Sequence, residues 1–147
     1  IESTSAPPPT GFEPDSQALQ DVSVLVVDDE LDARELVKRV LEDAGARVVM
    51  AGNVEEALEA VSNGFRPDVA VSDIGMPDHD GYEFIRRFRR LETVGAVPAA
   101  ALTALARSDD RRRVLMAGFQ THVAKPVDPY ELITVVASLA GRIGVKD

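Results

Sequence analysis

Apolar residues along the chain alternate between short continuous runs and longer stretches in which they recur every three or four positions. The short runs are typical of buried strands in a parallel sheet, and the longer stretches are typical of helices that pack on a sheet by one face. The alternation predicts repeated β–α units. The predicted strands are Val22–Val27, Ala46–Ala51, Asp68–Ser72, Val97–Leu102 and Gln120–Ala124.

A helix is predicted after each strand. Asn53 with Glu56 forms a capping box for the second helix, and Asp128 caps the last one, with Pro129 in its first turn. The expected helices lie at about Glu30–Ala44, Asn53–Gly64, around Tyr82–Leu91, at Ser108–Ala117 and from Asp128 onward. The expected inward residues are Ala33, Leu36, Val37, Val40, Leu41 and Ala44, then Tyr82, Ile85, Phe88 and Leu91, and finally Leu132, Val135, Val136 and Leu139. This order of elements predicts a doubly wound open α/β sheet, whose sites lie beyond the carboxyl ends of the strands.

The beginning of the chain lacks this periodicity and is rich in Pro, Ser and Thr, a composition typical of flexible linkers. We expect a linker over residues 1–20, one folded domain over residues 21–141 and a tail over residues 142–147. Because the chain begins with Ile instead of Met, we interpret it as a fragment or a processed form of a protein. After residue 141 only a short tail follows, so we expect no output domain downstream in this chain.

Composition narrows the function classes. The formal net charge of −9 would repel a phosphate backbone, so we expect no direct nucleic-acid partner. The absence of cysteine fits a reducing compartment, and no apolar run approaches the length of roughly 20 residues that spans a bilayer. We therefore expect a cytoplasmic location without membrane contact. The arginines at 86, 87, 89, 90, 107 and 111–113 are interpreted as solvated helix faces.

Polar side chains gather at the predicted carboxyl ends of the strands. Asp28 and Asp29 follow the first strand, Asp73 the third, Thr103 the fourth and Lys125 the fifth. Three adjacent carboxylates repel one another unless a cation lies between them, and hard oxygen ligands without His or Cys suit Mg²⁺. A lysine and a hydroxyl that face a metal-loaded aspartate suit phosphoryl transfer, with Asp73 as the candidate nucleophile.

Four segments at these strand ends resemble the receiver domain of two-component response regulators, over essentially all of Asp21–Gly141. The segments are DDE, DIGMPDHDG, LTA and AKP, in chain order. The likeness is greatest to the C-terminal receiver of a hybrid sensor histidine kinase. The resemblance implies a flavodoxin-like fold with a five-stranded parallel sheet of strand order 2-1-3-4-5 and five helices.

The resemblance also implies the roles of the acidic residues. Asp73 would be the phosphoacceptor, which takes a phosphoryl group from a phosphohistidine on a histidine kinase or a histidine phosphotransfer protein. Asp29 and Asp73 would bind Mg²⁺ directly, Asp28 would act through water, and the backbone carbonyl of Gly75 would complete the protein ligands. Such a domain catalyses its own phosphorylation and slow dephosphorylation, so its standing as an enzyme is left open.

The remaining implied roles concern switching. Lys125, joined to Pro126 by a cis peptide bond, would pair with the phosphoryl oxygens, and Thr103 would move inward to hydrogen-bond one of them. The signal would leave through the face of the fourth helix, fifth strand and fifth helix. His122 stands where the family commonly has Tyr or Phe, so its coupling to Thr103 is an open question. Gly75 and Leu105 occupy two positions that influence hydrolysis, and neither side chain can orient a water molecule.

Structural alternatives exist for each residue taken singly. Asp28, Asp29 and Glu30 could favour a helix N-terminus, while Asp73, Pro77 and Gly81 could form a turn and Asp80 a helix cap. Their joint occurrence at four strand ends favours the receiver interpretation. Within it, a hybrid-kinase receiver, a stand-alone single-domain regulator and an unphosphorylated pseudo-receiver that acts by binding remain open. A small phosphotransferase or phosphatase would generally have a second acid where Gly75 stands. The oligomeric state, cognate kinase and stimulus stay open.

Overall fold

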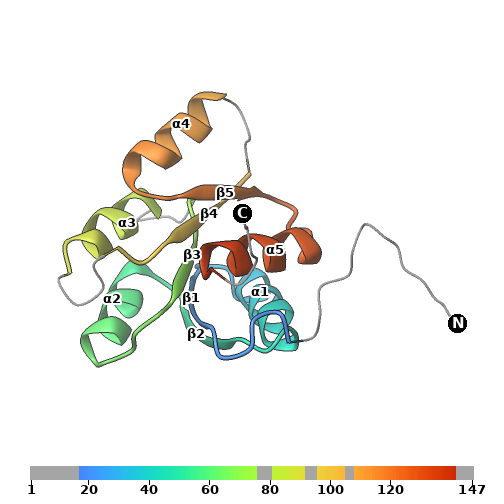
Figure 1. Cartoon of the computed structure of the whole chain (residues 1–147). Helices are drawn as coiled ribbons and strands as arrows, with labels where there is room; N and C mark the ends of the chain where they lie inside the picture. The colour runs from blue at the N-terminus through green and yellow to red at the C-terminus, as the bar shows by residue number, and fades with distance from the viewer. Residues whose placement is uncertain (1–16, 76–80, 92–95, 105–107, 142–147) are drawn as a thin grey trace, which may run out of the picture.

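The computed structural model describes residues 17–75, 81–91, 96–104 and 108–141. These residues form a parallel sheet of strand order β2-β1-β3-β4-β5, with a helix after each strand (Figure 1). The strands are β1 (Ser23–Val27), β2 (Arg47–Ala51), β3 (Val69–Asp73), β4 (Ala99–Thr103) and β5 (Thr121–Ala124). The helices are α1 (Leu31–Asp43), α2 (Val54–Ser62), α3 (Gly81–Arg89), α4 (Ser108–Ala117) and α5 (Pro129–Leu139). The predicted fold class and strand order are confirmed.

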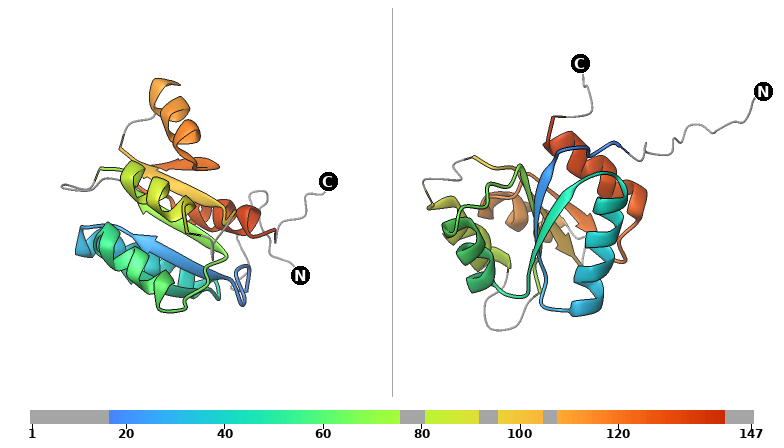
Figure 2. Two further views of the ribbon diagram at one scale, coloured as in Figure 1. Left: turned by 90° about the vertical axis from the view of Figure 1, so that its left-hand side faces the viewer. Right: turned by 90° about the horizontal axis from the view of Figure 1, so that it is seen from below.

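The sheet lies between two layers of helices. Helices α1 and α5 cover one face, whereas α2 and α3 cover the other and α4 lies beside β5 (Figures 1 and 2). The side chains of β1 alternate between two apolar clusters, with Val24 and Val26 in one and Leu25 and Val27 in the other. All residues of β3 and β4 are buried. Burial on both faces explains why these strands read as continuous apolar runs.

The predicted caps of α2 and α5 are confirmed. Asn53 Oδ1 accepts a hydrogen bond of 2.8 Å from the Glu56 N–H, and Asp128 Oδ1 accepts one of 2.9 Å from the Tyr130 N–H. These bonds satisfy backbone donors that the first turn of a helix leaves without an intrahelical partner. They fix where each helix leaves the end of the sheet that carries the acidic residues.

Two features differ from the sequence-based expectations. Leu36 is 52% exposed, although it was expected to face the core. At 3.6 residues per turn it lies about 90° from the centre of the stripe formed by Val37, Val40 and Leu41. Packing also begins before Asp21, because Leu19 is fully buried and its N–H donates to the Ala44 carbonyl. Residues 1–16 and the tail lie outside the described residues.

Candidate functional site

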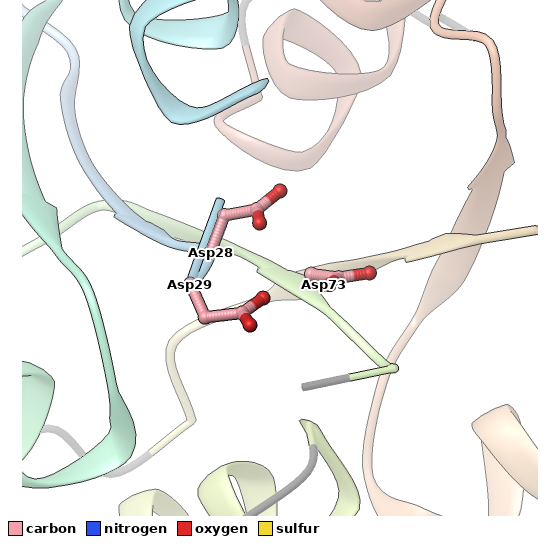
Figure 3. A group of neighbouring side chains, drawn as sticks. All are labelled: Asp28, Asp29 and Asp73. Atoms are coloured by element: carbon pink, nitrogen blue, oxygen red, sulfur yellow. The ribbon is translucent and has the colours of Figure 1, made fainter. Parts of the chain in front are cut away.

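Three carboxylates meet beyond the carboxyl ends of β1 and β3. Asp28 and Asp29 follow β1 directly, and Asp73 is the last residue of β3. One carboxylate oxygen from each lies within 4.8 Å of the other two. Figure 3 shows the three side chains as neighbours at the ends of their strands. The neighbouring parallel strands place these residues together, as the sequence predicted, and the cluster can hold a metal ion.

Asp28 is the most confined of the three acids. It is fully buried, and its Oδ1 accepts a hydrogen bond of 2.9 Å from the Glu30 N–H. Its Oδ2 is buried without a hydrogen-bond partner. Burial raises the pKa of Asp28, and the charges of Asp73 and Asp29 raise it further, against the opposing effects of the Glu30 N–H and the Lys125 charge. An oxygen in this state favours a cation beside it.

Lys125 links the acidic cluster to β5. Its Nζ lies 3.0 Å from Asp73 Oδ1 and 3.9 Å from Asp28 Oδ2, so the second contact is an ion pair too long for a hydrogen bond. Burial by itself lowers the pKa of Lys125, but the hydrogen bond and charge of Asp73, with the charges of Asp28 and Glu30, raise it above its usual value. The lysine is therefore held as a cation against Asp73.

The ends of β4 and β5 fix the position of this lysine. The Lys125 N–H donates a hydrogen bond of 2.8 Å to the Thr103 carbonyl, and the peptide bond between Lys125 and Pro126 is cis, as expected. Thr103 is 6% exposed. Because His122 pairs with Ala101, it lies on the same face of the sheet as Thr103, on the adjacent strand. The structure thus brings together the residues that the sequence singled out at four strand ends.

A pocket of about 390 Å³ opens over Asp73. It is lined by Asp73, Ile74, Gly75, Tyr82, Thr103, Ala104, Arg113 and Lys125. Two of its lining residues, Asp73 and Lys125, carry the opposite charges described above. A phosphoryl group has room in this pocket next to both.

Gly81 shapes the turn beside Asp73. A Cβ atom at this position would lie 2.4 Å from the Asp73 carbonyl oxygen and 2.9 Å from the Ile74 Cα. The Gly81 N–H also donates to the Ile74 carbonyl, at 3.1 Å. Close packing of α3 against the end of β3 therefore requires glycine here. The expected contributions of Pro77, Asp80 and Leu105 fall outside the described residues.

Sequence reasoning did not identify the contacts of three arginines, two of them at this end of the fold and the third, Arg89, at the opposite end of the sheet. Arg113 lines the pocket, with its Cζ 4.3 Å from the centre of the Tyr82 ring. Arg34 Nη1 donates to the Asp28 carbonyl at 3.0 Å. Arg89 is half-buried and bonds backbone carbonyls, so its interpretation as a solvated residue was wrong. Their partners are distant in sequence or lie on other elements, and charge patterning along one helix does not reveal them.

The sequence matches the response regulator receiver domain family over residues 24–137. The chain belongs to this family. The match spans the site residues from Asp28 to Lys125, so the resemblance read from the four strand-end segments is confirmed. Within the described residues of this receiver domain, no helix is long and apolar enough to cross a membrane.

The receiver domain is similar to two curated relatives whose own length it covers to different extents. It is 47% identical over 120 residues to the "Uncharacterized 14.6 kDa protein in sodA1 3'region" of Leptolyngbya boryana, which covers 82% of this chain and 91% of that protein. It is 37% identical over 122 residues to the response regulator Rre1 of a Synechocystis strain. That alignment covers 82% of this chain but 52% of Rre1, about half its length.

Solved structures of similar proteins share the fold. A putative response regulator from Chloroflexus aurantiacus has a TM-score of 0.77 and 30% identity, over 83% of this chain and 99% of that one. The signal receiver domain of a signal transduction histidine kinase from Syntrophus aciditrophicus has a TM-score of 0.73 and 28% identity, over 86% and 95% of the two chains. Receivers from different protein contexts therefore resemble this one to a similar degree.

Proposed function

We propose that this receiver domain accepts a phosphoryl group on Asp73 from a phosphohistidine of a histidine kinase or a histidine phosphotransfer protein. The observation that carries the proposal is the 3.0 Å contact between Lys125 Nζ and Asp73 Oδ1 at the edge of a pocket with room for a phosphoryl group. In the transfer, an Asp73 carboxylate oxygen forms a P–O bond while the P–N bond of the donor breaks, and the imidazole leaves. The Lys125 ammonium then stabilises charge on the phosphoryl oxygens.

The cofactor that fits the acidic cluster is Mg²⁺. Asp29 and Asp73 bind it directly in this proposal, Asp28 acts through water, and the Gly75 carbonyl supplies a further oxygen. The support is the spacing of the three carboxylates, the oxygen-only ligand set and the buried Asp28 Oδ2 without a hydrogen-bond partner. When bound, the ion would neutralise the carboxylates and bind phosphoryl oxygens.

The proposed switch runs from Thr103 to the face of α4, β5 and α5. The Thr103 hydroxyl hydrogen-bonds a phosphoryl oxygen on Asp73, and His122 responds on the adjacent strand. The support is the position of both side chains on one face of β4 and β5 and the presence of Thr103 in the wall of the pocket. An imidazole in place of a larger aromatic ring alters the strength of this relay without abolishing phosphorylation.

Two protein contexts remain for the domain. The hybrid-kinase context rests on the sequence resemblance alone, because the likeness to the receiver domain of a histidine kinase is no greater than that to a putative response regulator. The 47% identity to a 14.6 kDa protein, with 91% of that protein covered, supports a stand-alone regulator. The mass of the protein isolated from its own source would decide between them.

The decisive experiment measures phosphate incorporation by intact mass. The chain is incubated with acetyl phosphate or phosphoramidate, with Mg²⁺ or with a chelator, alongside Asp73→Asn. Asp43→Asn is the matched control, because Asp43 is exposed at the opposite end of α1 from the acidic cluster. One Mg²⁺-dependent phosphate, lost only in Asp73→Asn, is the expected result.

Other outcomes of this experiment identify the alternatives. Absence of phosphate under every condition would contradict the proposal and favour a pseudo-receiver that acts by binding. Continuous turnover of a phosphate ester, without a stable phosphorylated protein, would favour a small phosphotransferase or phosphatase. The glycine two residues after Asp73 disfavours that enzyme class, because those enzymes generally have a second acid at this position and this chain does not.

A further inference from the structure

Arg113 places a second cation at the pocket over Asp73. It comes from α4, whereas Lys125 follows β5, so the two positive charges reach the pocket from different elements. Within the described residues that line the pocket, Asp73 supplies the acidic charge and Arg113 and Lys125 supply the basic charge. Lys125 is already engaged by Asp73 at 3.0 Å. The Arg113 guanidinium is therefore the pocket charge available to an incoming anion.

The Tyr82 ring holds this guanidinium in place. Arg113 Cζ lies 4.3 Å from the ring centre, within the distance at which a cation and an aromatic face attract. Tyr82 is 8% exposed, so the ring is fixed by its surroundings, while Arg113 is exposed. A stacked guanidinium still presents its N–H groups at the ring edge, where they can bind phosphate oxygens.

The size of the pocket brings this charge within range of the phosphoacceptor. As a sphere, a volume of 390 Å³ is about 9 Å across, comparable to the Debye length of about 8 Å at physiological ionic strength. Asp73 and Arg113 border the same volume, so the guanidinium attracts a phosphate that approaches Asp73 with partial screening at physiological salt and with less screening at low ionic strength. At longer range the chain as a whole would repel an anionic donor, because its formal net charge is −9.

We propose that Arg113 binds the phosphate of the incoming donor and so favours donors of higher negative charge. This inference rests on the proposed function, in which Asp73 is the phosphoacceptor. With acetyl phosphate, the donor P–O bond breaks as Asp73 forms its own P–O bond, and acetate leaves with the bonding electrons. Arg113 holds phosphate oxygens during the approach, and Lys125 remains on the side of Asp73.

The test compares Arg113→Gln and Arg113→Lys with Arg112→Gln. Arg112 is the matched control, since it is exposed on the same helix and does not line the pocket over Asp73. The second-order rate of phosphate incorporation is measured with acetyl phosphate, a dianion near neutral pH, and with phosphoramidate, a net monoanion. Thermal melts of all variants exclude a general loss of stability as the cause.

Arg113→Gln should lower the rate of phosphate incorporation from acetyl phosphate by roughly three- to tenfold at low ionic strength. The rate with phosphoramidate should fall by a smaller factor. The rate of Arg113→Gln should also fall less steeply with added salt than that of the natural chain. Arg113→Lys should restore most of the lost rate, and Arg112→Gln should match the natural chain. Equal rates for Arg113→Gln and Arg112→Gln with both donors would overturn the role of Arg113 alone. If the natural chain accepts no phosphate, the proposed function fails and this inference fails with it.

Discussion

The Lys125 ammonium lies 3.0 Å from Asp73 and 3.9 Å from Asp28, so one cation contacts two members of the acidic cluster. The ammonium neutralises part of the repulsion between these carboxylates. It also occupies a position beside Asp73 where a metal ion could otherwise bind. The same contact that prepares the site for a phosphoryl group therefore competes with a bound cation for the carboxylate charge.

Replacement of Lys125 by Met should separate these two effects. Phosphate incorporation should fall by roughly a hundredfold, the usual cost of removing one group that stabilises developing charge. Mg²⁺ affinity should rise by roughly tenfold, because a cation that repels the ion is gone. Calorimetry suits the titration, since the chain has no tryptophan. Lys38→Met, on α1 and paired with Glu42, is the control. Unchanged Mg²⁺ affinity would contradict the competition.

Asp28→Asn should stabilise the metal-free domain. The pKa of Asp28 is raised in the folded state, chiefly by burial. Ionisation of Asp28 therefore lowers the free energy of unfolding increasingly as the pH rises from 3.8, the usual pKa of Asp, through the raised pKa. At about pH 7 the free energy of unfolding of the variant should exceed that of the natural chain by about 1–3 kcal/mol, the usual cost of a buried group without a partner. The difference should vanish at low pH, below the usual value, where Asp28 is protonated in both states.

Denaturant titration at several pH values, with a chelator and then with Mg²⁺, checks this expectation. Mg²⁺ should stabilise the natural chain more than Asp28→Asn and so reduce the gap. Glu59→Gln is the control, because Glu59 is exposed on α2. If the difference in the free energy of unfolding between the two proteins persists unchanged down to acidic pH, the buried charge is not its cause.

The sequence predicted the elements well because their signals are local. Asn53 and Asp128 cap helices through contacts two or three residues away, and strand burial shows as uninterrupted apolar runs. The acidic cluster followed from topology, since carboxyl ends of neighbouring parallel strands must meet. Leu36 was assigned to the core because a stripe drawn at helical spacing has no sharp edge, and contact with the sheet decides which border residues are covered.

The arginines could not be assigned in the same way. Arg89 bonds Val97 and Gly118, and Arg113 stacks on Tyr82, so each arginine has a partner distant in sequence. Most neighbouring arginines are exposed, as is Arg113 itself, and the local pattern of charge does not single out Arg89 and Arg113. Only the packing of α3, α4 and the start of β4 distinguishes an anchoring guanidinium from a solvated one.

Gly81→Ala should disturb the site through the backbone. The added methyl group would lie 2.4 Å from the Asp73 carbonyl oxygen, so α3 or the end of β3 must move. The free energy of unfolding should fall by roughly 1–3 kcal/mol, and phosphate incorporation should slow because Asp73 shifts. For stability, Gly75→Ala is the control, since a Cβ there meets no atom within 4 Å. Equal stability of the two variants, from denaturant titration, would contradict the close-contact argument.

Arg89→Met should weaken the fold more than substitution of Arg90, the exposed arginine that follows α3. The guanidinium donates to the Gly118 carbonyl at 2.8 Å, to the Val97 carbonyl and to Gln120 Oε1 at 3.2 Å. Burial lowers the pKa of Arg89, yet these acceptors compensate for its desolvation. Loss of the donors leaves half-buried carbonyls unsatisfied, which should cost roughly 2–4 kcal/mol. Urea titration of Arg89→Met and of Arg90→Met, whose arginine is exposed, measures the difference.

Arg89→Lys adds a second comparison. A single ammonium cannot reproduce a planar fork that serves three acceptors, which lie just before β4, just after α4 and just before β5. The stability of Arg89→Lys should therefore fall between those of the natural chain and Arg89→Met. Phosphate incorporation by the folded fraction should stay near that of the natural chain in both, because none of these acceptors lines the pocket over Asp73. Equal stability of Arg89→Met and Arg90→Met would show that the hydrogen bonds contribute nothing to the fold. A large loss of phosphorylation in the fully folded variants would instead place Arg89 in the communication between α3 and the phosphoacceptor.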